Sequence, residues 1–196
     1  TELKLPPKIY KIEHIEQTET QVKLLTSLTN YFQLEFGKVK IDTKYIFSLI
    51  NKSLQICAGF IKDDKDNVEK VHTNKDERLA EILDEINIYD KKVIIWCSYL
   101  NTTIKLKHML KQFNPLVLTG ATKDVNELVH EFQHNKKRNV LIAIQKKGAA
   151  SITLTSCNYA IYYSNSWSFD DRGNSEARIY RKGSEKHQHI TYLDLV

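Results

Sequence analysis

Apolar residues from Asn74 onward follow two alternating patterns. Runs of strand length, KKVIIWC, PLVLTG, NVLIAI and NYAIYYS, are separated by segments in which apolar residues recur every three or four positions. The helix predicted at 74–86 places four apolar residues on one face: Leu79, Ile82, Leu83 and Ile86. The remaining predicted elements are helices at 101–113, 123–134 and 171–182 and a strand at 189–196.

Strands that are apolar throughout and alternate with helices are typical of a parallel sheet that helices cover on both faces. We therefore predict an α/β domain with a mainly parallel sheet at 74–196. In such sheets, binding sites lie at the carboxyl ends of the strands.

The first 73 residues show a different pattern. Lys8–Gln17 alternates and predicts a strand or an extended crossover, and a helix capped by Thr18 follows it. That helix is expected to bury one stripe of residues: Val22, Leu25, Leu28 and Phe32. A second helix is predicted at Thr43–Cys57, and Ile61–Lys70 is a charged, solvated connector. We expect two parts, a crossover and helical lead-in at 1–73 and the α/β domain at 74–196.

Composition narrows the class of protein. The chain has 196 residues, 41% of them hydrophobic, and no apolar run approaches the length of a membrane span. Its three cysteines are widely spaced and form neither a metal-binding nor a disulfide pattern, which favours a reducing cytoplasm. The net charge of +5 permits a polyanionic partner. The chain begins without methionine and without a signal peptide, so we expect a piece of a longer polypeptide.

The loops after the predicted strands hold candidate anion-binding residues. Gln145–Thr155, QKKGAASITLT, offers small residues, backbone amides at a helix start and two lysines, Lys146 and Lys147. The alternative interpretation of this segment is an ordinary strand-to-helix turn with exposed lysines. Trp167 lies in the polar loop SNSWSFDD, where it either stacks on a base or, as we favour, closes the core.

Two arginines stand three residues apart in NSEARIYRKG, at Arg178 and Arg181. On a helix both would point from nearly the same face, and two neighbouring cations favour an anion opposite them. A phosphate suits the guanidinium fork best. Pairing with two nearby acids, Glu176 and Glu185, is the alternative.

Some chemistry is excluded. No G-x-x-x-x-G-K-[ST] loop is present to hold an ATP triphosphate, and no paired acids follow a strand. His130 and His134 are four residues apart, but the residues between them do not match a zinc-protease pattern.

Several segments, in order, resemble the second RecA-like lobe of a superfamily-two helicase of the Swi/Snf family of DNA-dependent ATPases. KVIIWCSYLNTTIKLKHML resembles motif IV, QKKGAASITLTSCNYAIYYSNSW resembles motif V and NSEARIYRKGS resembles motif VI. The resemblance implies a RecA-like fold of the P-loop NTPase type, preceded by a helical segment. The many Asn, Ile and Lys residues are compatible with a phage or viral member.

The resemblance also implies residue roles. Arg181, with Arg178 as partner, would reach the γ-phosphate of ATP bound on an N-terminal lobe of the same polypeptide, as an arginine finger does. The residues expected to support the ATP site are Asn174, Gly183, Gly148, Ser151 and Thr153. Those expected to contact the DNA backbone are Ser98, Lys105, Gly120, Lys146, Lys147 and Gly148.

This chain departs from the family pattern in both motifs. In motif VI, Asn174 replaces Gln, Ala177 replaces an acid and Ser184 replaces the final Gln. In motif V, Ser151 and Thr153 replace Gly and Asn.

The expected function is the C-terminal half of an ATP-dependent DNA helicase or translocase. ATP and Mg²⁺ would be held mainly by the N-terminal lobe, none would be bound tightly by this chain, and this chain alone would be inactive. The alternative is a stand-alone module that binds nucleic acid or protein and never hydrolyses ATP.

Overall fold

The computed structural model describes residues 4–42, 45–88, 90–148 and 152–196. Its contacts divide the chain into two compact units, each with its own core. One unit comprises the residues through His14 together with Leu79–Val196, and the other comprises Ile15–Arg78. The start of the chain therefore belongs with the sheet. The division into 1–73 and 74–196 as functional domains stays a prediction.

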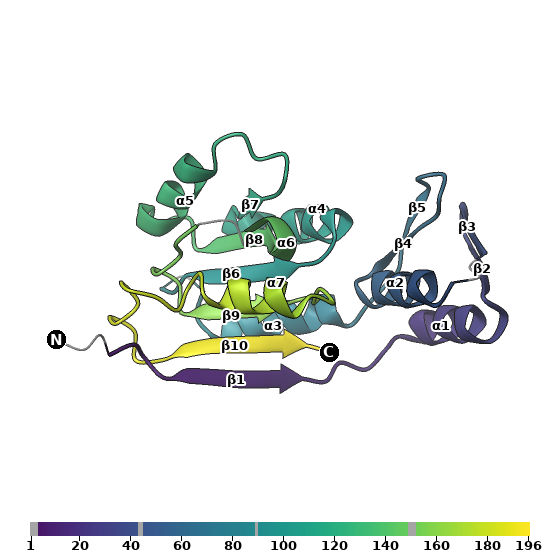
Figure 1. The fold of residues 1–196 in the computed structure, drawn as a ribbon, viewed down its shortest axis with the longest axis horizontal. Helices are drawn as coiled ribbons and strands as arrows, with labels where there is room; N and C mark the ends of the chain where they lie inside the picture. The colour runs from purple at the N-terminus through teal and green to yellow at the C-terminus, as the bar shows by residue number, and fades with distance from the viewer. Residues whose placement is uncertain (1–3, 43–44, 89, 149–151) are drawn as a thin grey trace. The chain divides into compact units, whose positions relative to one another are not determined.

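The larger unit is built on a six-stranded sheet in the order β1-β10-β9-β6-β8-β7 (Figure 1). All neighbouring strands are parallel, and the extended segment near the start of the chain is an edge strand paired along its length with the last strand. The predicted α/β fold with a parallel sheet is confirmed. The strands are β1 (Lys8–Glu13), β6 (Val93–Cys97), β7 (Leu116–Leu118), β8 (Val140–Ile144), β9 (Tyr159–Tyr162) and β10 (Ile190–Leu195).

Helices cover both faces of this sheet. Because crossovers between parallel strands are right-handed, α3 and α4 lie on one face and α5, α6 and α7 lie on the other. Figure 1 shows α7 in front of the sheet and α3 behind it. The helices are α3 (Lys75–Glu85), α4 (Leu100–Met109), a short 3₁₀ turn (Lys111–Phe113), α5 (Val125–His134), α6 (Gln145–Gly148) and α7 (Phe169–Glu176).

The core explains why the strands are apolar throughout. Every residue of β6 is buried, including Trp96, and so are Leu141 and Ala143 of the neighbouring β8. Phe132 of α5 packs against the same cluster. Side chains on both faces of the central strands are removed from water, which gives continuous apolar runs rather than alternation.

The smaller unit contains two hairpins that the sequence analysis did not predict. It contains α1 (Glu19–Tyr31), α2 (Ile46–Cys57) and two antiparallel hairpins, β2–β3 (Gln33–Phe36, Val39–Asp42) and β4–β5 (Phe60–Lys62, Val68–Lys70). The segment interpreted as a connector is thus the second hairpin. Asp63 forms its turn by accepting hydrogen bonds from the backbone amides of Lys65 and Asn67, each at 2.9 Å.

The first helix begins as predicted but buries a different face. The Thr18 hydroxyl accepts from the Gln21 amide in a capping box. Leu28 is fully buried as expected, whereas Val22 and Phe32 are exposed and Leu24 is buried in their place. The predicted stripe was therefore wrong at both ends.

Candidate functional site

The two arginines of NSEARIYRKG do not lie on a helix. Helix α7 begins after Ser168, whose side chain caps the Asp171 amide, and it ends at Glu176. The following residues form tight turns, in which the amides of Arg178 and Ile179 donate to carbonyls three residues back. The predicted helix through residue 182 is wrong, because α7 ends at Glu176 and the Arg178 carbonyl accepts a hydrogen bond from the Leu154 amide of another segment.

The chain before β9 holds these turns in place. The Leu154 amide donates to the Arg178 carbonyl at 2.9 Å. Arg181 donates from Nε to the Ala177 carbonyl at 2.8 Å and from Nη1 to the Thr153 hydroxyl at 3.0 Å. Residues of the predicted motifs V and VI are therefore in direct contact.

Neither arginine is neutralised by an acid of the described chain. The acceptors of Arg181 are two backbone carbonyls and one hydroxyl, all uncharged. Arg178 is 9% exposed, and its Nε is buried with no hydrogen-bond partner among the described residues. Burial, and after it the charge of Arg181, lowers the pKa of Arg178. A buried cation with an unpaired nitrogen beside a second, half-buried cation is costly by itself, and an anion near them would offset that cost.

The acids proposed as alternative partners are engaged elsewhere. Glu176 accepts hydrogen bonds from Arg172 Nε and from the Tyr10 hydroxyl, both at 2.8 Å. Glu185 accepts from the Gly183 amide at 2.6 Å. The structure therefore contradicts the interpretation in which Arg178 and Arg181 serve to pair with these two acids.

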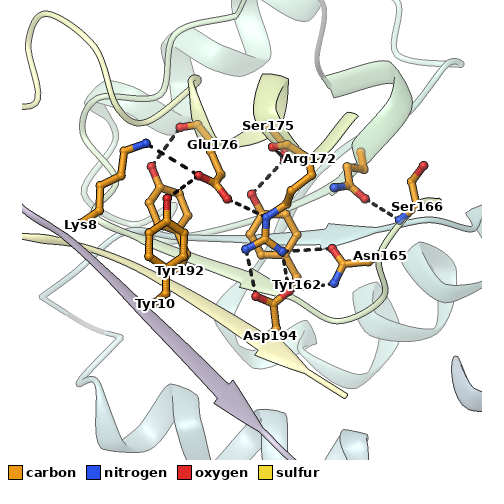
Figure 2. Close-up of polar contacts among 11 residues, drawn as sticks. Lys8, Tyr10, Tyr162, Asn165, Ser166, Arg172, Ser175, Glu176, Tyr192 and Asp194 are labelled. Atoms are coloured by element: carbon orange, nitrogen blue, oxygen red, sulfur yellow. Dashed lines mark hydrogen bonds and ion pairs between the residues drawn. The ribbon is translucent and has the colours of Figure 1, made fainter. Parts of the chain in front are cut away.

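A third arginine, which sequence reasoning missed, anchors the helix that precedes them. Figure 2 shows Arg172 of α7 in a fork with Asp194 of β10, with Nη2 donating to Oδ2 at 2.9 Å. Its guanidinium also lies 3.6 Å from the ring centroid of Tyr162. Burial opposes the charge, but hydrogen bonds to Asp194 and Glu176 raise the pKa of Arg172 above its ordinary value. Arg172 is thus a neutralised, structural arginine, in contrast to the two that follow.

The same network reaches the edge strand. Tyr10 of β1 stacks on Tyr192 of β10 with ring centroids 5.1 Å apart, and its hydroxyl donates to Glu176. Burial and this hydrogen bond raise the pKa of Tyr10 to about 12. Lys8 Nζ lies 3.8 Å from Glu176 Oε2 (Figure 2). The edge strand is thereby tied to the end of α7, next to the arginine turns.

Gly183 closes the arginine segment and needs to be glycine. Its φ is +104°, in the region that other residues avoid, and an added Cβ would lie 3.0 Å from the Thr155 hydroxyl oxygen. Asn174, the first expected residue of motif VI, is exposed on α7. Ser151 lies outside the described residues.

The candidate DNA contacts differ in position and in how far their groups are already hydrogen-bonded. Ser98, Gly120 and Lys146 follow β6, β7 and β8, which are neighbours in the sheet, so they lie along one carboxyl edge. Gly120 and Lys146 are exposed. Lys105, in contrast, donates from Nζ to the Tyr163 hydroxyl at 2.8 Å. The side chain of Ser98 is half-buried and donates to the Ser164 carbonyl at 3.1 Å.

The other two candidates, Lys147 and Gly148, lie in α6, and their side chains are outside the described part of the structure.

Trp167 is 73% exposed and Phe169 is 90% exposed, so the interpretation of Trp167 as a core residue was wrong. Both follow β9, which places them after a strand end like the candidate DNA contacts.

The described residues include no group of three His, Cys, Asp or Glu side chains able to hold a metal ion. Within the same residues, no helix has the length and apolar character needed to cross a bilayer. Cys97 and Cys157 are fully buried, and burial raises the pKa of both thiols.

Comparison with known proteins places the site in context. The model of the helicase conserved C-terminal domain matches residues 74–183. The putative ATP-dependent helicase/translocase YwqA of Bacillus subtilis is 25% identical over 96% of this chain. The chromatin-remodeling ATPase INO80 of Candida glabrata is 27% identical over 56% of this chain. The chain spans 21% of the first relative and 8% of the second.

Two solved structures share the fold. The C-terminal part of the Fun30 ATPase domain superposes with a TM-score of 0.70 at 18% identity, covering 97% of this chain and 86% of that one. The Sulfolobus solfataricus SWI2/SNF2 ATPase core in complex with dsDNA gives a TM-score of 0.69 at 19% identity, covering 97% of this chain and 41% of that one.

Proposed function

Because this chain belongs to the family of helicase conserved C-terminal domains, we propose that it is the arginine-supplying half of an ATP-driven DNA translocase. The resemblance to the C-terminal lobe of Swi/Snf-type helicases is confirmed by the relatives and the shared fold. The roles of individual residues are proposals, argued below from their contacts.

One observation supports the arginine roles more than any other. Of the three arginines in the segment 172–181, Arg172 is fully paired with acids, whereas Arg178 and Arg181 have no acidic partner among the described residues. A chain that needed only to stabilise its fold would neutralise all three. We propose that the charge left over on the last two is neutralised by the γ-phosphate of ATP.

The contacts of Arg181 suit that role. Bonds from Nε and Nη1 fix the orientation of the guanidinium, while the Nη2 group makes no hydrogen bond within the described residues. A cation that is already oriented needs little reorganisation when charge develops on the transferring phosphoryl group. We propose that Arg181 is the principal finger and that Arg178 assists it. Thr153 and Gly183 then support the finger by holding its side chain and its turn.

The triphosphate and Mg²⁺ would be held by another lobe. This chain has no P-loop sequence, and its described residues offer no cluster of ligands for a divalent ion. We propose that an N-terminal RecA-like lobe of the same polypeptide binds ATP and Mg²⁺. The contribution of this chain is then positive charge in the closed state.

We propose that the carboxyl edge after β6, β7 and β8 contacts the DNA backbone. Exposed Gly120 and Lys146 are suited to phosphate contact, because a bare backbone approaches closely and an ammonium group attracts phosphate. Ser98 lies at the same edge, but its amide and its hydroxyl both donate to Ser164 and would have to leave it. Lys105 is bound to Tyr163 and would have to leave it, so we assign it the weakest contribution.

The test is DNA-stimulated ATP turnover by a two-lobe protein, meaning a polypeptide that joins this chain to an ATP-binding lobe. Loss of turnover in Arg181→Ala with retained folding supports the proposal. A stand-alone binding module, the alternative function, would instead bind nucleic acid or protein equally well without either arginine.

A further inference from the structure

A cavity of about 600 Å³ lies at the amino edge of the sheet, opposite the edge assigned to DNA. Its walls come from residues just before β6, β8 and β10 and at the start of β9. These segments are far apart in the sequence and meet only through the strand order. Nothing in the proposed ATP or DNA chemistry uses this cavity.

The charge of the cavity is strongly one-sided. Four lysines line it, and Asp90 is its single acid. The Asp90 carboxylate accepts a hydrogen bond from Asn87 at 2.8 Å, and no ion pair joins it to a lysine in the described chain. Lys91, Lys136 and Lys186 are exposed and likewise have no ion pair or hydrogen bond to a described residue.

The fourth lysine is part of the wall. Lys92 donates from Nζ to the Asn135 and Arg138 carbonyls, at 2.8 and 2.9 Å, and so caps the carbonyls after α5. Burial lowers its pKa, and the charge of Lys186 lowers it further. The cavity therefore has a hydrogen-bonded cation in its wall and three exposed ones around it.

Polar and aromatic groups complete the lining. Ser156 and Asn158 are half-buried residues of the lining. The Tyr159 ring lies edge-on to His189 at 6.5 Å between centroids, and Lys91 Nζ lies 5.4 Å from the Tyr159 centroid.

We propose that this cavity is a second phosphate-binding site, separate from the arginine turns. The exposed lysines supply charge, and the concave shape brings several cations to one group. Lysine binds phosphate as a point charge without demanding the planar geometry that arginine imposes. The phosphate could come from a nucleic-acid backbone or from a small free polyphosphate, and the experiment distinguishes these sources.

The test is a titration of the ¹⁵N-labelled chain, followed by amide NMR, with sodium tripolyphosphate and separately with a 20-base-pair duplex. Tripolyphosphate is expected to shift the amides of Asn158, Tyr159 and His187–His189 in a saturable way. The same shifts with duplex identify a nucleic-acid backbone as the source. A response to tripolyphosphate alone identifies a small free phosphate.

Charge variants make the assignment specific. Lys91→Ala with Lys186→Ala should weaken tripolyphosphate binding at these amides by about fivefold or more. Lys136→Glu, at another exposed position, should weaken it at least as much. A control with the same loss of charge, Lys65→Ala with Lys70→Ala, changes two exposed lysines of the other compact unit and should leave the affinity unchanged.

Three results would overturn the proposal. The first is no shift of these amides with either probe. The second is equal weakening in the cavity variants and in the control pair, which would mean that net charge alone attracts the anion. The third is an acidic heptaglutamate peptide that binds at the same amides as tightly as tripolyphosphate. Because Lys146 and Arg181 are unchanged throughout, failure here leaves the proposed function untouched.

Discussion

The Nη1 group of Arg181 donates a hydrogen bond to the Thr153 hydroxyl at 3.0 Å, joining two segments that are 28 residues apart in the sequence. The partner is a neutral oxygen, so the bond orients the guanidinium without cancelling its charge. In our account, Thr153 is a positioning residue for an arginine finger.

Thr153→Val should therefore lower DNA-stimulated turnover of the two-lobe protein several-fold while costing only about 1 kcal/mol of stability. Valine keeps the shape of threonine but removes the acceptor. Thr153→Ser restores the hydroxyl and should rescue most of the turnover. Turnover and melting temperature are measured for both variants. An equal loss in valine and serine variants would show that packing, not the hydrogen bond, matters at this position.

Arg172→Ala should show the opposite behaviour to a change at Arg181. It removes the arginine that pairs with both Asp194 and Glu176 and leaves these partly buried carboxylates with weaker partners, at a cost of roughly 2–4 kcal/mol. Turnover per folded molecule should stay close to normal below the melting transition. The check is a denaturant titration beside the turnover assay, with exposed Lys182→Ala as control. A stable Arg172→Ala protein that cannot turn over ATP would contradict the structural role of Arg172.

The chain alone should release no phosphate from ATP above background, with or without DNA. The physical reason is that positive charge opposite the γ-phosphate has no effect without groups that bind the triphosphate and Mg²⁺. The measurement is phosphate release by the purified 196-residue chain. Activity that persists through purification and changes in Lys146→Ala would contradict this prediction.

DNA binding by the chain should be weak and sensitive to salt, with a Kd of roughly 10⁻⁴ to 10⁻⁶ M. Lys146→Ala with Lys147→Ala should weaken it about equally for all sequences and flatten the dependence on salt, since phosphate contacts carry no sequence information. Fluorescence anisotropy at several salt concentrations measures both quantities. Full affinity in this double variant, or weakening equal to that of the Lys65→Ala, Lys70→Ala control, would place the contacts elsewhere.

Much of the larger unit could be predicted from the sequence because burial on both sides gives each central strand a continuous apolar run. The candidate DNA contacts were chosen because they lie at or near the ends of these strands, whereas the roles of the motif residues came from the resemblance to Swi/Snf helicases and stay predictions. The direct contact between Thr153 and Arg181 is compatible with that assignment but could not be derived from it. It depends on the path of the chain between β8 and β9.

What the sequence did not reveal depends on long-range partners. Asp194 is the one charged residue of β10, and the pairing of β10 with β9 brings it to Arg172 and Tyr162. Local periodicity also favoured a helix through Arg181, although tertiary bonds such as that from Leu154 to the Arg178 carbonyl hold turns there instead. Trp167 was expected to close the core, but its loop leaves it in solvent.

The most direct test of the account is DNA-stimulated ATP turnover by the two-lobe protein with Arg181→Ala, measured beside ATP affinity, DNA affinity and a melting curve. We predict a loss of about 10³-fold in kcat, at the low end for arginine fingers because Arg178 remains, with both affinities and the melting temperature nearly unchanged. Arg181→Lys should rescue poorly, since an ammonium group lacks the planar fork. Normal kcat in the folded Arg181→Ala protein would contradict the central claim.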